Sequence, residues 1–252
     1  MAQPFRTILL DAAGSTNREA FERAKAGEAG PLWVVARRQT EGRGRNGRPW
    51  ASELGNLYAS LLLRLAHAGK VQQLALLAGV AVREAILAAA QGPITGLRLK
   101  WPNDVLIDGA KCAGILCESQ SSAAGERVVV IGIGINLTSH PSGIGRAATD
   151  LAAHGLELTL EVMLTSLDAA MAPWLATWNG GAGFERVRAA WLAGAGNAGE
   201  SLTVNTGAEE ITGTFVDLDL GGGLVLRDRR GVMRTLTFGD VTLLPPSAPE
   251  VS

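Results

Sequence analysis

The amino-acid sequence predicts an α+β protein in two parts, a large N-terminal part of strands and helices and a small C-terminal β-barrel. The chain has 252 residues, of which 47% are hydrophobic, so it can bury one large core and one small one. The segment GAGNAG at 194–199 has the composition of a linker. After it, short apolar segments alternate with Gly and Asp turns, which indicates a barrel of about 50 residues.

The first elements follow from local patterns. TILL at 7–10 and LWVVAR at 32–37 have the composition of strands. Between them, Thr16 and Glu19 have the spacing of a capping box, which predicts a helix that begins at Thr16 and continues through AFERAK. LYASLLLRL at 57–65 is the next predicted strand, and the apolar residues of 71–91 recur at helical spacing.

The remaining elements complete the two parts. LRLKW, CAGILCES and RVVVIGIGINL are predicted strands at 97–101, 112–119 and 127–137. Helices are predicted at 160–178 and 184–192, with Pro173 as a kink or boundary. Strands of the barrel are expected at 201–205, 211–218, 223–227, 233–238 and 241–244. We therefore expect a first domain at 1–195, a second at 196–246 and a disordered tail at 247–252.

Composition and motifs argue against several classes of protein. The net charge of −1 does not suggest bulk binding to nucleic acid or membranes. The N-terminus lacks the pattern of a signal peptide, and no run of ~18 mostly apolar residues predicts a transmembrane helix. Cys112 and Cys117 are five apart in a predicted strand, which places them on opposite faces as core thiols of a reducing, cytoplasmic protein. No P-loop, histidine metal-ligand spacing or Ser/His/Asp arrangement stands out.

An arginine-rich loop carries most of the local charge. Residues 37–48 hold five Arg and one Glu, a charge of +4, which leaves −5 for the rest of a chain whose net charge is −1. Its core, GRGRNGRPW at 42–50, alternates glycines that let the backbone approach a ligand with guanidiniums that attract an anion. A phosphate with a carboxylate is the expected target. A solvated loop and an RNA-binding Arg/Gly tract remain alternatives, although the tract lacks repeats and an aromatic platform.

A second segment, KWPNDVLIDGAKCAGIL at 100–116, contains two of the four lysines among the 23 basic residues. Pro102 follows the end of a strand and Asn103-Asp104 form turns, so Lys100 is expected to project over a cleft. Lys111 re-enters the sheet after a hairpin turn. Two ammonium groups on one hairpin can neutralise a triphosphate, whereas an ordinary hairpin with surface lysines is the alternative.

A third segment, VVVIGIGINL at 128–137, is not a dinucleotide fingerprint because position 137 is Leu and no crossover helix follows. We interpret it as a central strand in which Gly132 and Gly134 leave room for a ligand on the sheet. Asn136, at the end of the strand, offers the donor and acceptor that an adenine edge requires. A β-bulge is the alternative interpretation.

Five motifs together, GSTN, QTEGRGRNGRPW, KWPNDV, KCAGIL and GIGINL, resemble the biotin–protein ligases in order and spacing, and the resemblance covers essentially the whole chain. It implies a mixed β-sheet with helices packed on one side, the class II synthetase-like catalytic fold of biotin and lipoate ligases, followed by an SH3-like β-barrel. The implied activity joins biotin to ATP as biotinyl-5′-AMP with release of pyrophosphate, then transfers biotin to a lysine. GSTN begins at residue 14, so a monofunctional ligase without an N-terminal DNA-binding domain is expected.

The resemblance also implies site residues. Catalytic roles fall to Lys100, Arg43 and Arg45. The residues expected to bind biotin are Ser15, Thr16, Asn17, Gln39, Gly42, Arg43, Gly44, Arg45, Lys100, Gly132 and Gly134. The nucleotide side is expected to comprise Arg48, Trp50, Asn103, Lys111 and Asn136. One departure from the family pattern is Asn46, where many relatives have another Arg. Mg²⁺ is expected to bridge the phosphates of ATP, but no metal-binding residue is assigned.

The implied partner is a biotin carboxyl carrier protein domain that presents the acceptor lysine, with no nucleic acid and no membrane; a weak or ligand-linked homodimer stays open. Two other functions compete with this reading, a lipoate–protein ligase and a biotin-responsive regulator or catalytically silent biotin-binding module. We also expect the loop at 42–48 to be mobile without ligand, because its arginines repel one another and it has no apolar anchor of its own.

Overall fold

The computed structural model describes residues 3–65, 71–121, 125–143, 145, 147–196 and 198–244. Its first sheet is formed by seven strands: β1 (Arg6–Leu10), β2 (Leu32–Ala36), β3 (Leu57–Leu65), β4 (Arg98–Lys100), β5 (Asp104–Ile107), β6 (Ala110–Ser121) and β7 (Arg127–Ile135). Their order is β1-β2-β3-β7-β6-β5-β4. β1 and β2 are parallel, while the other neighbouring pairs are antiparallel, so the sheet is mixed, as expected.

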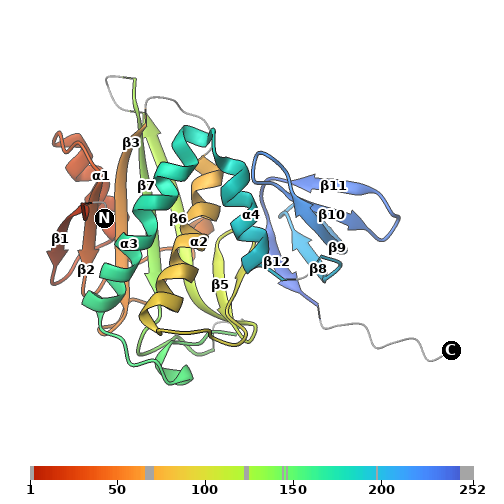
Figure 1. Ribbon diagram of the computed structural model, residues 1–252, viewed down its shortest axis with the longest axis horizontal. Coiled ribbons are helices and arrows are strands. Elements are labelled where there is room, and N and C mark those ends of the chain that lie inside the picture. The colour runs from red at the N-terminus through yellow and green to blue at the C-terminus, as the bar shows by residue number, and fades with distance from the viewer. Residues whose placement is uncertain are drawn as a thin grey trace.

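Four α-helices cover this sheet (Figure 1), α1 (Thr16–Lys25), α2 (Val71–Ala89), α3 (Leu160–Trp178) and α4 (Phe184–Gly194). Side chains alternate along β2, so Trp33 and Val35 join the large core beneath α2, α3 and α4. Val34 points to the other face, where it packs against Phe21 of α1. The predicted one-sided arrangement therefore holds for α2, α3 and α4. α1 lies on the opposite face because it connects the parallel strands β1 and β2 and presents its own apolar stripe.

α2 is the central helix of the large core. It is long and apolar enough to cross a membrane by length and composition, contrary to the absence of such a run expected from the sequence. Its apolar residues are instead buried against the sheet and against α3 and α4, with Leu74, Leu77 and Val82 fully buried. Pro173, expected as a kink or boundary, lies inside the continuous helix α3.

The two cysteines, expected on opposite faces of a strand, both face the helical core. The register between β5 and β6 shifts so that Val105 pairs with Ala113 and Leu106 with Lys111, which leaves Cys112 as an extra residue. This bulge interrupts the alternation of side chains, and both Cys112 and Cys117 contact the large core. Both thiols are free, and burial raises the pKa of each to about 12.

The second sheet is formed by β8 (Ser201–Asn205), β9 (Glu210–Leu218), β10 (Leu224–Asp228), β11 (Met233–Leu236) and β12 (Asp240–Leu243), close to the predicted strands. It is antiparallel, in the order β11-β10-β9-β8-β12, in agreement with an SH3-like fold. Trp101 Nε1 donates to the carbonyl of Gly222 at 3.0 Å, and Gln73 Nε2 donates to that of Leu220 at 2.9 Å. These contacts hold the second sheet beside α2 and beside the segment Lys100-Trp101-Pro102, called the KWP segment below. The predicted tail at 247–252 lies outside the described residues.

Candidate functional site

The predicted site residues gather on the sheet face that carries α1, away from α2, α3 and α4. A small cavity of about 80 Å³ lies between the N-terminus of α1, the arginine-rich loop, β6 and β7. Next to it is a wider cleft of about 920 Å³, which the KWP segment, the arginine-rich loop and β12 enclose. The second volume is in the range of pockets that bind small molecules. Nine residues line both spaces: Gln39, Arg45, Arg48, Pro49, Trp50, Asn103, Asp104, Lys111 and Asp240.

One end of the site is a neutral hydrogen-bonding floor. α1 begins at Thr16, as predicted, but the capping differs from the predicted box: the N-cap is Ser15, whose side chain does not cap. Gln39 Oε1 accepts instead from the Thr16 backbone N–H at 2.8 Å and from the Thr16 hydroxyl at 3.1 Å. Gln39 Nε2 then donates to Ser52 Oγ at 3.0 Å. Gln39 therefore fixes the helix terminus that presents these polar groups.

Gly132 and Gly134 lie beneath this floor, where neighbouring side chains leave no room for a Cβ atom. An ideal Cβ on Gly132 would lie 2.2 Å from Asn17 Oδ1, and one on Gly134 would lie 2.6 Å from the Trp50 ring. The room that the glycines leave is thus filled by the Asn17 amide and the Trp50 indole. Trp50 Nε1 is buried and has no hydrogen-bond partner among the described residues. A polar ligand atom can satisfy that N–H.

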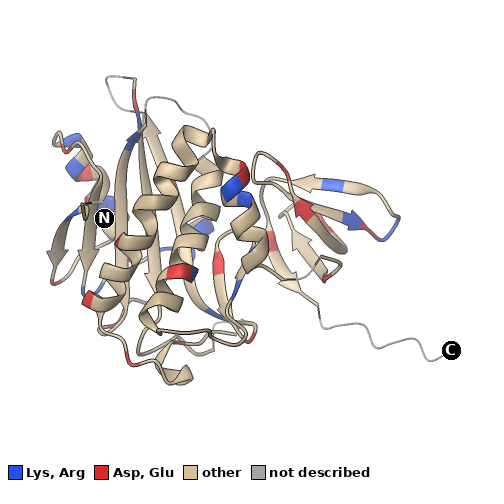
Figure 2. Ribbon diagram, viewed as in Figure 1, with Lys and Arg blue, Asp and Glu red and all other residues tan. Residues whose placement is uncertain are grey.

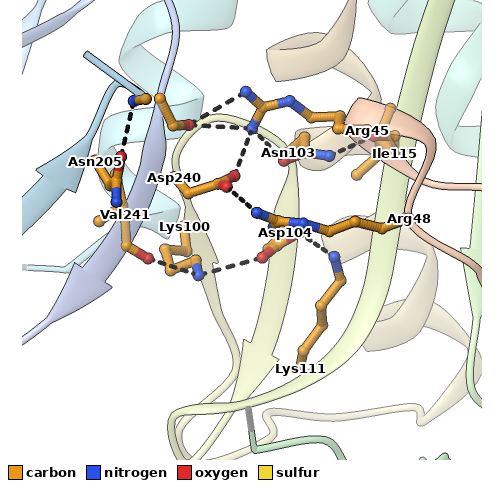
Figure 3. A network of polar contacts seen from close by, with 12 residues as sticks. Arg45, Arg48, Lys100, Asn103, Asp104, Lys111, Ile115, Asn205, Asp240 and Val241 are labelled. Atoms are coloured by element: carbon orange, nitrogen blue, oxygen red, sulfur yellow. Dashed lines mark hydrogen bonds and ion pairs between the residues drawn. The ribbon is translucent and has the colours of Figure 1, made fainter. Parts of the chain in front are cut away.

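The other end of the site is cationic, with two lysines on one carboxylate (Figure 3). Lys100 Nζ lies 3.2 Å from Asp104 Oδ2, and Lys111 pairs with Asp104 Oδ1. Burial by itself raises the pKa of the Asp104 carboxyl, but the charges and hydrogen bonds of Lys111 and Lys100 outweigh it, so the pKa lies below 3.8. Asp104 is therefore ionised at neutral pH. Lys100 also donates to the Val241 carbonyl at 3.1 Å, and it lines the wider cleft, as the end of a strand over a cleft predicts.

The arginine-rich loop is anchored by carboxylates from outside it. Arg48 Nη2 lies 2.5 Å from Asp240 Oδ2, and Arg45 Nη1 lies 3.7 Å from Asp240 Oδ1 (Figure 3). Arg45 also donates to the carbonyl of Gly239 at 3.2 Å, and Arg43 pairs with Glu118 at 3.1 Å. Carboxylates of β12 and β6, which lie far away in sequence, therefore offset the repulsion among the arginines from which mobility was expected, and mobility itself stays a prediction. Figure 2 shows acidic and basic residues in both parts of the molecule.

The tip of the arginine-rich loop is a turn that contains two left-handed residues. Asn46 has φ 56° and Gly47 has φ 69°, both in the left-handed region. Asn adopts that region more readily than Arg, so Asn46 favours this turn. A Cβ on Gly42 would lie 2.5 Å from both the Trp50 carbonyl and Ser52 Oγ, so this glycine permits the close approach of two backbone segments.

The remaining predicted residues lie on the walls. Asn103 accepts from Arg45 at 3.4 Å and donates to the Ile115 carbonyl at 2.6 Å. The Lys111 ammonium lies 5.3 Å from the centre of the Trp50 ring, a cation–π contact. Asn136 lines the wider cleft, but its Nδ2 donates to the Thr149 carbonyl at 2.9 Å. Binding of nucleotide by these groups stays a prediction.

Two family models match the sequence of this chain. Residues 12–136 match the model of the biotin/lipoate A/B protein ligase family, and residues 199–244 match the biotin protein ligase C terminal domain. A biotin–[acetyl-CoA-carboxylase] ligase of Paracoccus denitrificans is 40% identical over 230 residues, which cover 88% of this chain and 95% of the relative. The chain belongs to the biotin–protein ligase family.

Solved structures of biotin protein ligases have the same fold. The Aquifex aeolicus ligase in complex with biotin and ATP has a TM-score of 0.78 and 29% identity, covering 95% of this chain and 98% of that one. The Leishmania major ligase in complex with biotinyl-5-AMP has a TM-score of 0.65 and 25% identity, covering 92% and 98%.

This member of the biotin–protein ligase family shows no protein site for Mg²⁺ in its described part. No group of three or more His, Cys, Asp or Glu side chains lies together there. The two acidic residues of the cationic end are already engaged, Asp104 by two lysines and Asp240 by two arginines. The side chains present therefore do not fit a dedicated metal centre.

Four residues of the candidate site escaped the sequence-based predictions. One is Asp104, which was expected only in a turn but pairs with Lys100 and Lys111. Ser60 on β3 lies in the polar floor, Glu118 on β6 pairs with Arg43, and Asp240 on β12 pairs with Arg45 and Arg48. A polar residue inside the buried strand LYASLLLRL is the signal that would have marked Ser60. No local pattern marks Asp240, because its partners are about 190 residues away in the chain.

Proposed function

We propose that this protein is an ATP-dependent biotin–protein ligase that forms biotinyl-5′-AMP, releases pyrophosphate and transfers biotin to a lysine of a carboxyl carrier protein. The observation that carries the proposal is the polarity of the site. A neutral hydrogen-bonding floor at one end suits a ureido ring. The other end suits a carboxylate that meets a triphosphate, because it holds four cations: Arg45, Arg48, Lys100 and Lys111. Biotin combines a neutral ring with an anionic tail, so its two ends match the two ends of the site.

The first half-reaction requires two anions to approach. The biotin carboxylate attacks the α-phosphate of ATP, the bond between the α-phosphate and the β-phosphate oxygen breaks, and pyrophosphate leaves. Fixed cations offset the repulsion and stabilise the charge that builds up in the transition state. Lys100 supports this role best, because Asp104 and the Val241 carbonyl hold its ammonium at the mouth of the cleft. Arg43 and Arg45 are proposed to close over the adenylate.

The remaining assignments follow the geometry. Ser15, Thr16, Asn17 and Gln39 are proposed to bind the biotin ring above Gly132 and Gly134, with Gly42 and Gly44 shaping the loop around it. Arg48, Trp50, Asn103, Lys111 and Asn136 are proposed on the nucleotide side, because all five line the wider cleft. The Trp50 indole occupies the junction of the two spaces, so we infer that it moves when both ligands bind.

Mg²⁺ is proposed to enter with ATP, bound by the phosphates and water, since the described side chains do not form a site for it. The carrier domain, a first domain at 1–195, a second at 196–246 and a weak or ligand-linked homodimer are likewise proposals. A reducing location such as the cytoplasm fits the two free thiols.

One assay tests the function. The protein is incubated with ATP, Mg²⁺ and either biotin or lipoate, and pyrophosphate release and the intact mass of an added carrier domain are measured. We expect pyrophosphate release and a mass increase on the carrier with biotin but not with lipoate. If lipoate gives both products and biotin gives neither, the protein is a lipoate ligase. If biotin binds but no pyrophosphate is released, the protein is a silent binding module.

A further inference from the structure

Glu118 links the polar floor to the arginine-rich loop. Asn17 Nδ2 donates to Glu118 Oε2 at 2.7 Å, and Arg43 Nη2 lies 3.1 Å from Glu118 Oε1. Side chains alternate along β6, so Glu118 projects on the same face as Gly114, toward the site and away from the large core. Its side chain is 31% exposed, so Glu118 is not a core residue.

The hydrogen bonds of Asn17 are almost fully used by the protein. Its amide has two N–H donors and two acceptor positions on Oδ1. The donors go to Glu118 Oε2 and, at 3.3 Å, to the Leu116 carbonyl. Both partners only accept, so they fix the amide with Nδ2 toward β6. Oδ1 lies 2.6 Å from Ser60 Oγ, a fully buried hydroxyl, and this contact takes one acceptor position. One acceptor position therefore remains on a residue that lines the small cavity.

We propose that Glu118 is a positioning residue that presents Asn17 to the substrate as a hydrogen-bond acceptor and thereby selects a ring with an N–H donor. This inference rests on the proposed function, in which the ring is the ureido ring of biotin. A dithiolane ring has no N–H and gains nothing from this acceptor. Without Glu118, one donor of the Asn17 amide loses its charged partner and the orientation of the amide is no longer fixed.

The contact with Arg43 offers a rival role for Glu118, namely electrostatic anchoring of the loop. Two conservative variants separate the roles. Glu118→Gln keeps the length of the side chain and an acceptor oxygen for Asn17, but removes the charge that pairs with Arg43. Glu118→Asp keeps the charge but is one methylene shorter. The long, partly exposed side chain of Arg43 can follow the shorter carboxylate, whereas the buried Asn17 amide cannot, so only the contact with Asn17 is lost. Glu118→Ala removes both contacts.

The experiment is calorimetric titration of the full chain, without ATP, with biotin and with its two mono-N-methylated ureido analogues. In the wild type, one of the two analogues is expected to bind about tenfold more weakly than biotin. Its methyl group replaces the hydrogen of the N–H that donates a hydrogen bond to Asn17 Oδ1. Glu118→Gln should retain both the affinity and this discrimination. Glu118→Ala and Glu118→Asp should bind biotin about tenfold more weakly and discriminate little between biotin and that analogue.

The control is Gln120→Ala, two residues further along β6 on the same face and exposed. It should bind like the wild type. If Glu118→Gln loses as much affinity as Glu118→Ala while Glu118→Asp retains it, the carboxylate acts on Arg43 and the inference is overturned. It is also overturned if all three variants keep wild-type discrimination. Failure of the wild type to bind biotin at all refutes the proposed function instead, so the two failures are distinguishable.

Discussion

Asp104→Asn tests whether one carboxylate holds both lysines of the cationic end in place. The substitution keeps the shape of the side chain and removes its charge. Lys100 and Lys111 then both lose the negative charge that they share, in side chains that are only 21% and 11% exposed. Removing one partner of a buried pair costs 3–5 kcal/mol, and the lower end applies here because Lys100 is partly solvated. At about 3 kcal/mol, a chain of this size should melt about 6–12 °C lower.

The assay is thermal unfolding at neutral pH, with and without ATP and Mg²⁺. A bound triphosphate supplies the missing negative charge, so the difference in melting temperature between variant and wild type should narrow when ATP is present. Asp11→Asn is the matched control, because it removes the same charge from a side chain that is fully solvent-exposed. Its melting temperature should stay close to that of the wild type.

The pH dependence has a definite sign. Since the pKa of Asp104 is lowered in the folded protein, its contribution to stability is present above its ordinary value of 3.8 and is lost as the pH falls below that value. The stability difference between wild type and variant should therefore be constant near neutral pH and shrink in acid. Equal melting temperatures at neutral pH would refute the reasoning, since the lysines would then need no buried counter-charge.

Three further predictions concern Lys100, the packing of Trp50 and the arginine-rich loop. Lys100→Ala should slow pyrophosphate release about 10²-fold while biotin still binds, which corresponds to ~3 kcal/mol for one electrostatic donor. Lys100→Arg should not restore the rate fully. A wild-type rate in the Ala variant contradicts the proposed role of Lys100. Gly134→Ala should displace the Trp50 indole, on which the new Cβ would lie at 2.6 Å, and change the tryptophan fluorescence of the free protein; an unchanged spectrum contradicts the packing. Arg45→Gly should still form some adenylate but release it early, which biotinylation of added albumin reports; retention as tight as in the wild type contradicts the gating role.

Local patterns predicted the parts of the molecule whose structure is decided locally. The central strand β7 and the helical spacing of α2 follow from side-chain burial, and the strands after residue 200 were predicted within a few residues of those observed. The KWPND turn placed Lys100 at the end of a strand over a cleft, as found. The residues that the family resemblance suggested for the site line the two adjoining spaces, while their roles in binding and catalysis stay predictions.

The misses arise from contacts that no local window contains. Asp240 meets the arginine-rich loop only because the second sheet docks beside the KWP segment. Gln39 replaces the predicted capping box because the chain after β2 returns to the N-terminus of α1. The bulge at Cys112 depends on the register that β5 and β6 adopt together, which the spacing of two cysteines does not reveal.

The position of the site on the sheet has a consequence for protein engineering. Along β7, Val129 and Ile131 are buried in the core beneath α2, α3 and α4, whereas Gly132 and Gly134 face the ligand side. Ligand preference and thermal robustness are therefore encoded in alternate positions of the same strands. Libraries restricted to the ligand-facing positions can search for enzymes that accept altered cyclic ureas while the other set is optimised separately for heat tolerance. Recombining the two sets should give nearly additive gains wherever the paired positions share no contact.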